Sequence, residues 1–99
     1  MQTEKIKLSK KTAQGYSIPL GPFNLVFIHT DIGMLGCGAF DVHALDKFTY
    51  PAAKVKSLIG DPIAEISDIV KGVIKETNKR AKELGIIEGM PAIDALERL

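Results

Sequence analysis

Hydrophobic and polar positions alternate along the first half of the chain, which is the pattern of half-buried β-strands. Residues 4–9 set two apolar side chains between lysines, and this predicts the first strand. A weaker strand is expected over residues 16–20, where Pro19 confines it to an edge or an end of a sheet. Residues 23–30 are apolar on both faces, so this segment is expected at the centre of the sheet.

Residues 33–40 predict a further strand that contains three glycines. The short connection before it favours a hairpin with the preceding strand. With a two-residue loop, Cys37 faces Val26 and His29 lies on the opposite face of the sheet. With a three-residue loop, Cys37 faces Phe27 and His29 shares its face as a diagonal neighbour. The sequence leaves both registers open.

Helical periodicity follows this strand. Asp41 suits the N-cap of a short amphipathic helix over residues 42–48, because its carboxylate can accept from the free amides of the first turn. Residues 52–59 then return to the alternation of a strand, with lysines on the wet face.

The last part of the chain, residues 62–99, shows helical spacing throughout. One apolar stripe precedes Gly72 and a second covers residues 73–84. A continuous helix through Gly72 stays open, since one interior glycine costs only about 1 kcal/mol. Gly85-Ile86 predicts a Schellman stop, and Pro91 opens a final helix that is expected to bury its apolar positions.

The predicted fold class is α+β, in one domain over residues 1–99: a mixed or antiparallel sheet from the N-terminal half, with one inserted helix, covered by C-terminal helices. Hydrophobic residues make up 45% of the chain, and there is no tryptophan. Aliphatic side chains must therefore form the core. A chain of this size buries a core without much margin, so self-association into a homo-oligomer is expected.

Charge and cysteine content indicate the cellular compartment and limit the classes of partner that are expected. Thirteen basic and twelve acidic residues leave a net charge of +1, which favours neither a nucleic-acid partner nor a membrane. One cysteine permits no internal disulfide, and no apolar signal segment follows the first methionine. The longest uninterrupted apolar run spans only residues 25–28. These features predict a cytoplasmic protein.

Four lysines gather near the N-terminus, at Lys5, Lys7, Lys10 and Lys11. A contact with an anion or with RNA would have only Tyr16 nearby for stacking. Solvated lysines on an edge hairpin, where they discourage strand-to-strand aggregation, are the preferred interpretation. No nucleic-acid partner is therefore expected.

Several glycine-centred motifs in the chain are shared with one known family. They are Gly33 followed by Leu35, Cys37-Gly38, Gly85-Ile86 before Gly89-Met90, and Ala95-Leu96 near the end. Over roughly residues 20–99 the chain resembles the YunC-like family, small prokaryotic proteins catalogued as a domain of unknown function. The resemblance implies a small α+β domain and brings no established activity, so no catalytic residue carries over. Pro91 departs from the family pattern, which has a small polar cap after Met90.

The candidate site is the glycine-flanked thiol at Gly36-Cys37-Gly38. Two glycines on one face of a strand leave a smooth strip for a flat ligand or a neighbouring chain, or for close packing within the protomer. Cys37 is interpreted first as a buried small hydrophobe, then as a ligand contact, and last as a nucleophile. A nucleophile needs a depressed pKa, and the nearby Asp41 carboxylate would act in the opposite direction. His29 is the nearest candidate base.

No other constellation points to specific chemistry. The two histidines, His29 and His43, lack metal-ligand spacing with Cys37, so neither a metal nor a cofactor is expected. The glycine spacing reverses the dinucleotide-binding fingerprint. The resulting hypothesis is a non-enzymatic binding or assembly module, with an unidentified small-molecule ligand or a second copy as partner and with contact residues Gly36, Cys37, Gly38 and His29. The alternative is a thiol-dependent enzyme or redox sensor that uses Cys37.

Overall fold

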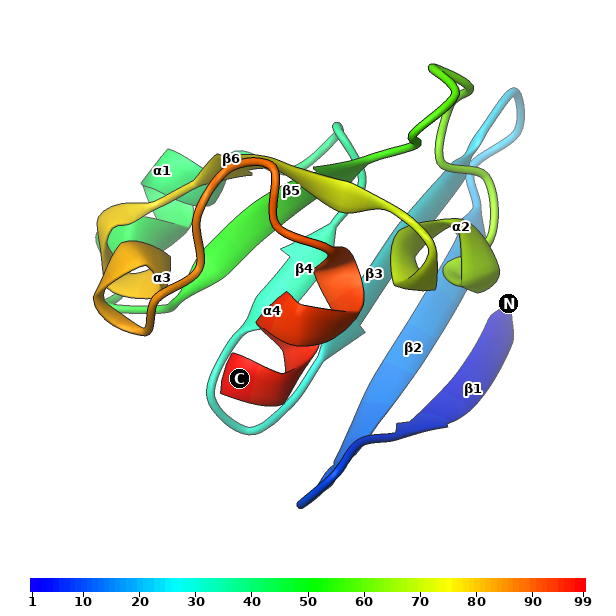
Figure 1. The fold of residues 1–99 in the computed structure, drawn as a ribbon. Helices are drawn as coiled ribbons and strands as arrows, with labels where there is room; N and C mark the ends of the chain where they lie inside the picture. The colour runs from blue at the N-terminus through cyan, green and yellow to red at the C-terminus, as the bar shows by residue number, and fades with distance from the viewer.

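The computed structural model describes residues 1–99 and contains one six-stranded sheet (Figure 1). The strands are β1 (Gln2–Lys7), β2 (Thr12–Pro19), β3 (Asn24–His29), β4 (Met34–Gly36), β5 (Ala52–Lys56) and β6 (Val73–Thr77). The helices are α1 (Val42–Asp46), α2 (Ile66–Val70), α3 (Lys79–Glu83) and α4 (Ala92–Arg98). The strands lie side by side in chain order, and every neighbouring pair is antiparallel except the parallel pair β4 and β5. The predicted α+β class is confirmed.

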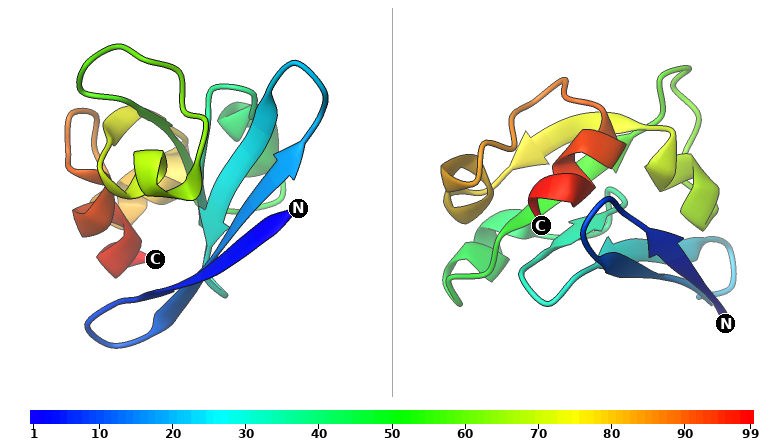
Figure 2. Two further views of the ribbon diagram at one scale, coloured as in Figure 1. Left: turned by 90° about the vertical axis from the view of Figure 1, so that its right-hand side faces the viewer. Right: turned by 60° about the horizontal axis from the view of Figure 1, so that its bottom comes forward.

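The two faces of the sheet are covered differently. The inner face carries α2, which packs against β2 and β3, and α4, which packs against β4 and β6. The opposite, outer face carries α1, the crossover between the parallel strands, which packs against β5 and β6. The left panel of Figure 2 shows α1 on the side of the sheet opposite α2 and α4. No helix lies on the outer face of β1 and β2, and this open area positions the candidate site.

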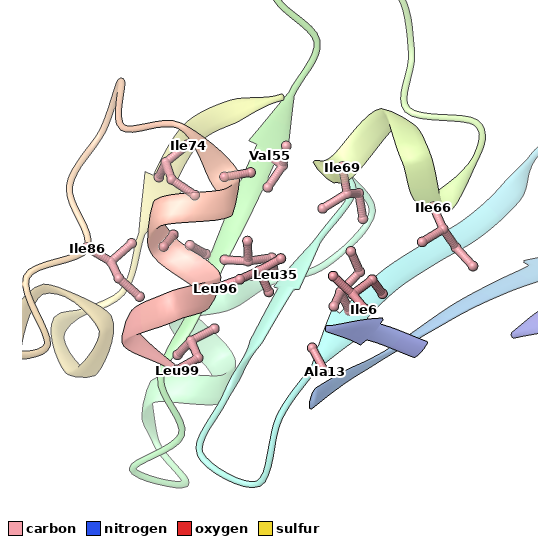
Figure 3. Packing of buried hydrophobic residues seen from close by; sticks show 14 of the residues in the cluster. Ile6, Ala13, Leu35, Val55, Ile66, Ile69, Ile74, Ile86, Leu96 and Leu99 are labelled. Carbon is pink, nitrogen blue, oxygen red and sulfur yellow. The ribbon is translucent and has the colours of Figure 1, made fainter. Parts of the chain in front are cut away.

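The hydrophobic core lies between the inner face and its helices (Figure 3). Strand residues at alternate positions are fully buried there, as the pleat requires; they include Val26, Ile28, Leu35, Ala53 and Val55. The helices contribute Ile66, Ile69, Ala95 and Leu96, and Leu99 follows directly after α4. Burial of aliphatic side chains of this kind stabilises a fold by about 1.5–3 kcal/mol each.

The β3–β4 hairpin has the two-residue register. Thr30 N–H donates to the carbonyl of Gly33 over 2.9 Å, and Ile28 pairs with Leu35. Beyond the end of β4, Cys37 N–H donates to the carbonyl of Val26 over 3.0 Å. The first of the two open registers is therefore correct, and the central position predicted for β3 is confirmed.

The sequence signals that predicted the ends of helices and strands are also confirmed. The Asp41 side chain accepts from Ala44 N–H over 3.0 Å as the N-cap of α1. Gly85 has φ +87° and forms the predicted Schellman stop, in which Ile86 N–H donates to the carbonyl of Ala81 over 3.1 Å. Pro19 ends β2, in agreement with the prediction of a strand end at a residue that has no N–H to donate.

The main correction concerns residues 73–84, which were predicted to be helical. They form β6, then α3. The apolar positions at the start of this segment fit both periods, but three of its first five residues are β-branched and favour a strand. Asn78 then ends the strand and caps α3 by accepting from Ala81 N–H over 2.9 Å. The sheet therefore also draws a strand from the C-terminal half.

Smaller corrections concern element boundaries. β2 begins at Thr12, four residues before the predicted start at residue 16, and β5 ends at Lys56 rather than at residue 59. α2 begins at Ile66, four residues after the predicted start. In α4, Ile93 is 37% exposed although it was expected in the core, because Ala92, Ala95 and Leu96 take the buried stripe. None of the four short helices has the length and apolar character of a membrane span.

Candidate functional site

The predicted site residues separate onto the two faces of the sheet. Cys37 points into the core between β3 and the inner-face helices and is 6% exposed. His29 lies on the outer face, half-buried, with its Nδ1 3.2 Å from the carbonyl oxygen of Thr30. The thiol and the imidazole therefore do not share an environment, and His29 cannot act as a base toward Cys37.

The two glycines beside the thiol face different surroundings. The ring of Phe40 lies over Gly36, where a side chain of any size would collide with it. This is close packing within the protomer, made by the loop before α1. Gly38 lies past the end of β4, and a methyl group placed there would meet nothing within 4 Å. The strip is thus occupied at Gly36 and open at Gly38.

Surface hollows lie away from these residues. One, of about 280 Å³, is lined by polar residues near the N-terminus, including Ser17, Asn24 and Glu65. Another, of about 230 Å³, lies beside the loop of Leu58 and Ile59. No group of three or more histidine, cysteine, aspartate or glutamate side chains is placed to share a metal ion. Any contact at Gly36–Gly38 is therefore made on an open surface rather than in a cavity.

Aromatic side chains gather on the outer face at the centre of the sheet. The ring centroids of Tyr16 and Phe27 are 5.1 Å apart, and those of Tyr16 and His29 are 5.6 Å apart. The third distance, between Phe27 and His29, is 6.3 Å. The planes of the two pairs that include Tyr16 differ by 26° and 13°, so these rings are stacked, whereas Phe27 and His29 are tilted by 36°. We call these three residues the aromatic patch.

Strand register explains why the patch forms. Tyr16 faces Phe27 directly across β2 and β3, and His29 is one pair farther along, opposite Gln14. Directly opposed and diagonal side chains on one face are within reach of aromatic rings. Phe40 closes the side toward β4 by setting its edge on Phe27, with centroids 5.5 Å apart and planes at 74°. All three patch residues are half-buried, so the patch is partly accessible at the surface.

A cluster of charged side chains lies at the far end of the row that crosses the sheet through the aromatic patch. The register aligns one row across all six strands: Thr3, Tyr16, Phe27, Gly36, Lys54 and Glu76. At its far end, Lys54 Nζ lies 3.4 Å from Glu76 Oε1, and His43 Nε2 lies 2.5 Å from Glu76 Oε2. The hydrogen bond with His43, followed by hydrogen bonding and charge from Lys54, lowers the pKa of the Glu76 carboxyl below its ordinary value.

Sequence reasoning placed His29 and Gly36 in the site but missed Tyr16, Phe27 and Phe40 as a group. The signal was present, because the alternation along β2 and β3 already puts both strand aromatics on the side opposite Val26 and Ile28. It required the β2–β3 register, which the predicted strand boundaries did not give.

Comparisons with known proteins identify a family and a similar fold, but neither has an assigned activity. A family model described as "Domain of unknown function (DUF1805)" matches residues 36–99. A crystal structure described as a protein of unknown function, TA1206 from Thermoplasma acidophilum, superposes with a TM-score of 0.82 at 24% identity. The match covers 96% of this chain and 91% of that one. No curated protein matches. The expectation of a small domain without an assigned function is confirmed, although neither description carries the YunC name.

Proposed function

We propose that this chain, which belongs to the family described as a domain of unknown function (DUF1805), is a non-enzymatic binding or assembly module that acts through the outer face of β1, β2 and β3. The observation that carries the proposal is the aromatic patch of Tyr16, Phe27 and His29, which lies on the outer face beside the part that α1 covers. Accessible apolar surface gathered in one area of a small domain is typical of interaction sites.

The folding role of the sheet accounts for only one member of the patch. The inner face supplies the large core cluster, and Phe27 packs against the smaller outer-face cluster of Met34, Val42 and Ala52 under α1. Tyr16 and His29 belong to neither cluster. Aromatic rings have faces that stack on planar partners, and they lose little conformational entropy when a ligand covers them. The patch therefore supports binding of a planar group or of another protein surface.

The placement of Cys37 supports a non-enzymatic role. A reactive thiol needs solvent access and a nearby cation or base, and Cys37 has neither the access nor His29 on its own face. The thiol-dependent alternative gains no support from the geometry. A cytoplasmic location remains part of the proposal, since a single cysteine suits a reducing compartment.

Two measurements test the proposal. Amide chemical shifts of ¹⁵N-labelled protein are followed while indole, an uncharged planar probe, is added. In parallel, sedimentation equilibrium measures the mass over a wide range of protein concentration. We expect either indole-induced shifts confined to β2 and β3, or an association that buries these strands.

Matched variants locate the response on the surface. Tyr16→Leu keeps apolar bulk but removes a ring of the patch, and it should abolish the indole shifts or weaken the association. Phe48→Leu removes a ring that is 77% exposed and pairs with none of the three, so it should leave the response unchanged. A monomer that shows no shifts on β2 and β3, or a response that survives Tyr16→Leu, overturns the proposal.

A further inference from the structure

The outer face of β1, β2 and β3 carries positive charge and no acidic side chain. Ile6 points into the core, so the alternation of β1 puts Lys5 and Lys7 on the outer face. Neither lysine forms an ion pair. The outward positions of the next two strands are neutral or imidazole: Thr12, Gln14, Tyr16, Ile18, Leu25, Phe27 and His29. The aromatic patch therefore lies beside a row of unpaired cations.

The strand register determines where the lysines of β1 lie relative to the aromatic patch. Lys5 lies opposite Gln14, which in turn lies opposite His29, while Tyr16 lies opposite Thr3 on β1. Neighbouring strands are about 4.8 Å apart, so the lysines of β1 are one strand from Tyr16 and two from His29. A ligand that stacks on the rings can place an anionic group within reach of a flexible lysine side chain.

We propose that this face binds single-stranded nucleic acid, with about two bases stacked on the aromatic patch and the phosphates of the backbone held by Lys5 and Lys7. The inference rests on the proposed function and names the class of partner. Stacking rings beside a cationic border are the combination by which proteins bind single strands with little sequence preference. Stacking on bases and contacts with phosphates are possible with RNA and DNA alike, so similar affinities are expected for the two. This proposal departs from the expectation of no nucleic-acid partner, which rested on the net charge and on the interpretation of the N-terminal lysines as solvated edge residues.

Charge argues against a second copy of the chain on this face, and the burial of the rings argues against a membrane. In a symmetric dimer the same surface meets itself, so Lys5 and Lys7 of both copies would face a surface without a single carboxylate. A membrane-binding surface needs apolar side chains that protrude into the headgroup region. The rings of the patch are instead half-buried and lie against one another across the sheet.

Fluorescence anisotropy tests the inference with the full chain. The probes are labelled hexauridylate, labelled hexadeoxythymidylate and a DNA duplex of the same charge per strand. We expect similar dissociation constants for the two single strands and weaker binding of the duplex, whose bases are stacked inside. Tyr16→Leu should weaken single-strand binding about fivefold to a hundredfold, whereas Phe48→Leu should leave it unchanged.

The charge component has its own variants, which do not endanger the fold because both lysines are exposed. The double variant Lys5→Gln, Lys7→Gln should flatten the slope of log affinity against log salt by about 1.4, as two lost phosphate contacts require. Lys82→Gln changes an exposed lysine on α3 and should leave the slope unchanged.

Any of the following results overturns the inference. They are a duplex that binds as tightly as the single strands, a dissociation constant indifferent to Tyr16→Leu, a salt slope indifferent to the double lysine variant, and binding to anionic phosphatidylserine vesicles without binding to either oligonucleotide. If indole still shifts β2 and β3 while no oligonucleotide binds, the nucleic-acid inference fails and the proposed function stands. If indole leaves these strands unperturbed and the protein stays monomeric, both fail.

Discussion

The two faces of this sheet are built from the same strands but have different roles. On the inner face, alternate residues of β3 and β4 such as Ile28 and Leu35 are completely buried under α2 and α4. On the outer face, the residues in between, such as Phe27 and His29, remain half-exposed because α1 covers only the β4–β6 side. The contrast teaches that residues one position apart in sequence are divided between a face that forms the core and a face that stays partly accessible, where binding is proposed.

The largest contrast between the faces should appear in the chemistry of Cys37. Because its thiol is in the core, alkylation by iodoacetamide at neutral pH should be slower in the native protein than in urea by about a hundredfold or more, since reaction requires opening of the fold. Mass spectrometry of quenched samples measures both rates. Comparable rates would place the thiol at the surface and would revive the thiol-dependent alternative.

Truncation of side chains should separate the faces by stability. Leu35→Ala removes a side chain with no exposed surface and should lower the free energy of unfolding by about 3 kcal/mol. Tyr16→Leu, on the outer face, should cost about 1 kcal/mol, the scale of a lost aromatic pair. Urea denaturation followed by circular dichroism gives both values. Equal losses would contradict the division of roles.

How much of this division was predictable depends on the range of the contacts involved. The N-cap at Asp41 and the Schellman stop at Gly85 were predictable, because each is specified by residues within a few positions. Residues 73–77 were not, since their apolar spacing fits a helix as well as a strand. Pairing with β5, more than fifteen residues away in sequence, decides in favour of the strand.

Only part of the candidate site was predictable from the sequence, because the rest depends on contacts between residues far apart in the chain. The glycines around Cys37 were visible in the sequence, and the two possible hairpin registers were both derived from it. The aromatic patch depends on the pairing of Tyr16 with Phe27, which is set by the β2–β3 hairpin and not by any local motif. Phe40 joins it only because the loop before α1 folds back over Gly36.

The outer-face helix depends on one buried amide. Asn78 has no exposed surface; its Nδ2 donates to the carbonyls of Val42 and Tyr50 over 2.9 and 2.8 Å. Its Oδ1 accepts from Ala52 N–H over 3.2 Å as well as from the first turn of α3. Asn78→Ala leaves all four backbone groups without this partner and should lower the free energy of unfolding by about 2–3 kcal/mol.

This loss should be local to the α1 side, which distinguishes it from truncation of the core. Hydrogen exchange measured by NMR should show the greatest loss of protection in α1 and α3, with β1 and β2 least affected. A uniform loss across all six strands would show that α1 is not an independently attached element.

The smallest expected effect concerns the edge of the inner face, where Glu97 of α4 holds the β1–β2 turn. Ser9 Oγ donates to Glu97 Oε2 over 2.5 Å, and Ser9 N–H donates to Oε1 over 2.9 Å. These two bonds, the hydroxyl first, lower the pKa of the Glu97 carboxyl below its ordinary value of 4.5. A lowered pKa means that the unfolded chain binds the proton more tightly. The contribution of Glu97 to stability is therefore complete above pH 4.5 and is lost as the pH falls through the lower, folded value.

Because the Glu97 carboxylate is solvated, the effect should be a small drop in the urea midpoint between neutral and acidic pH. Glu97→Gln should reduce that drop, whereas Glu88→Gln, which changes an exposed carboxylate without such a partner, should preserve it. An unaltered pH profile in Glu97→Gln would show that the turn is held by the packing of Leu8 rather than by charge.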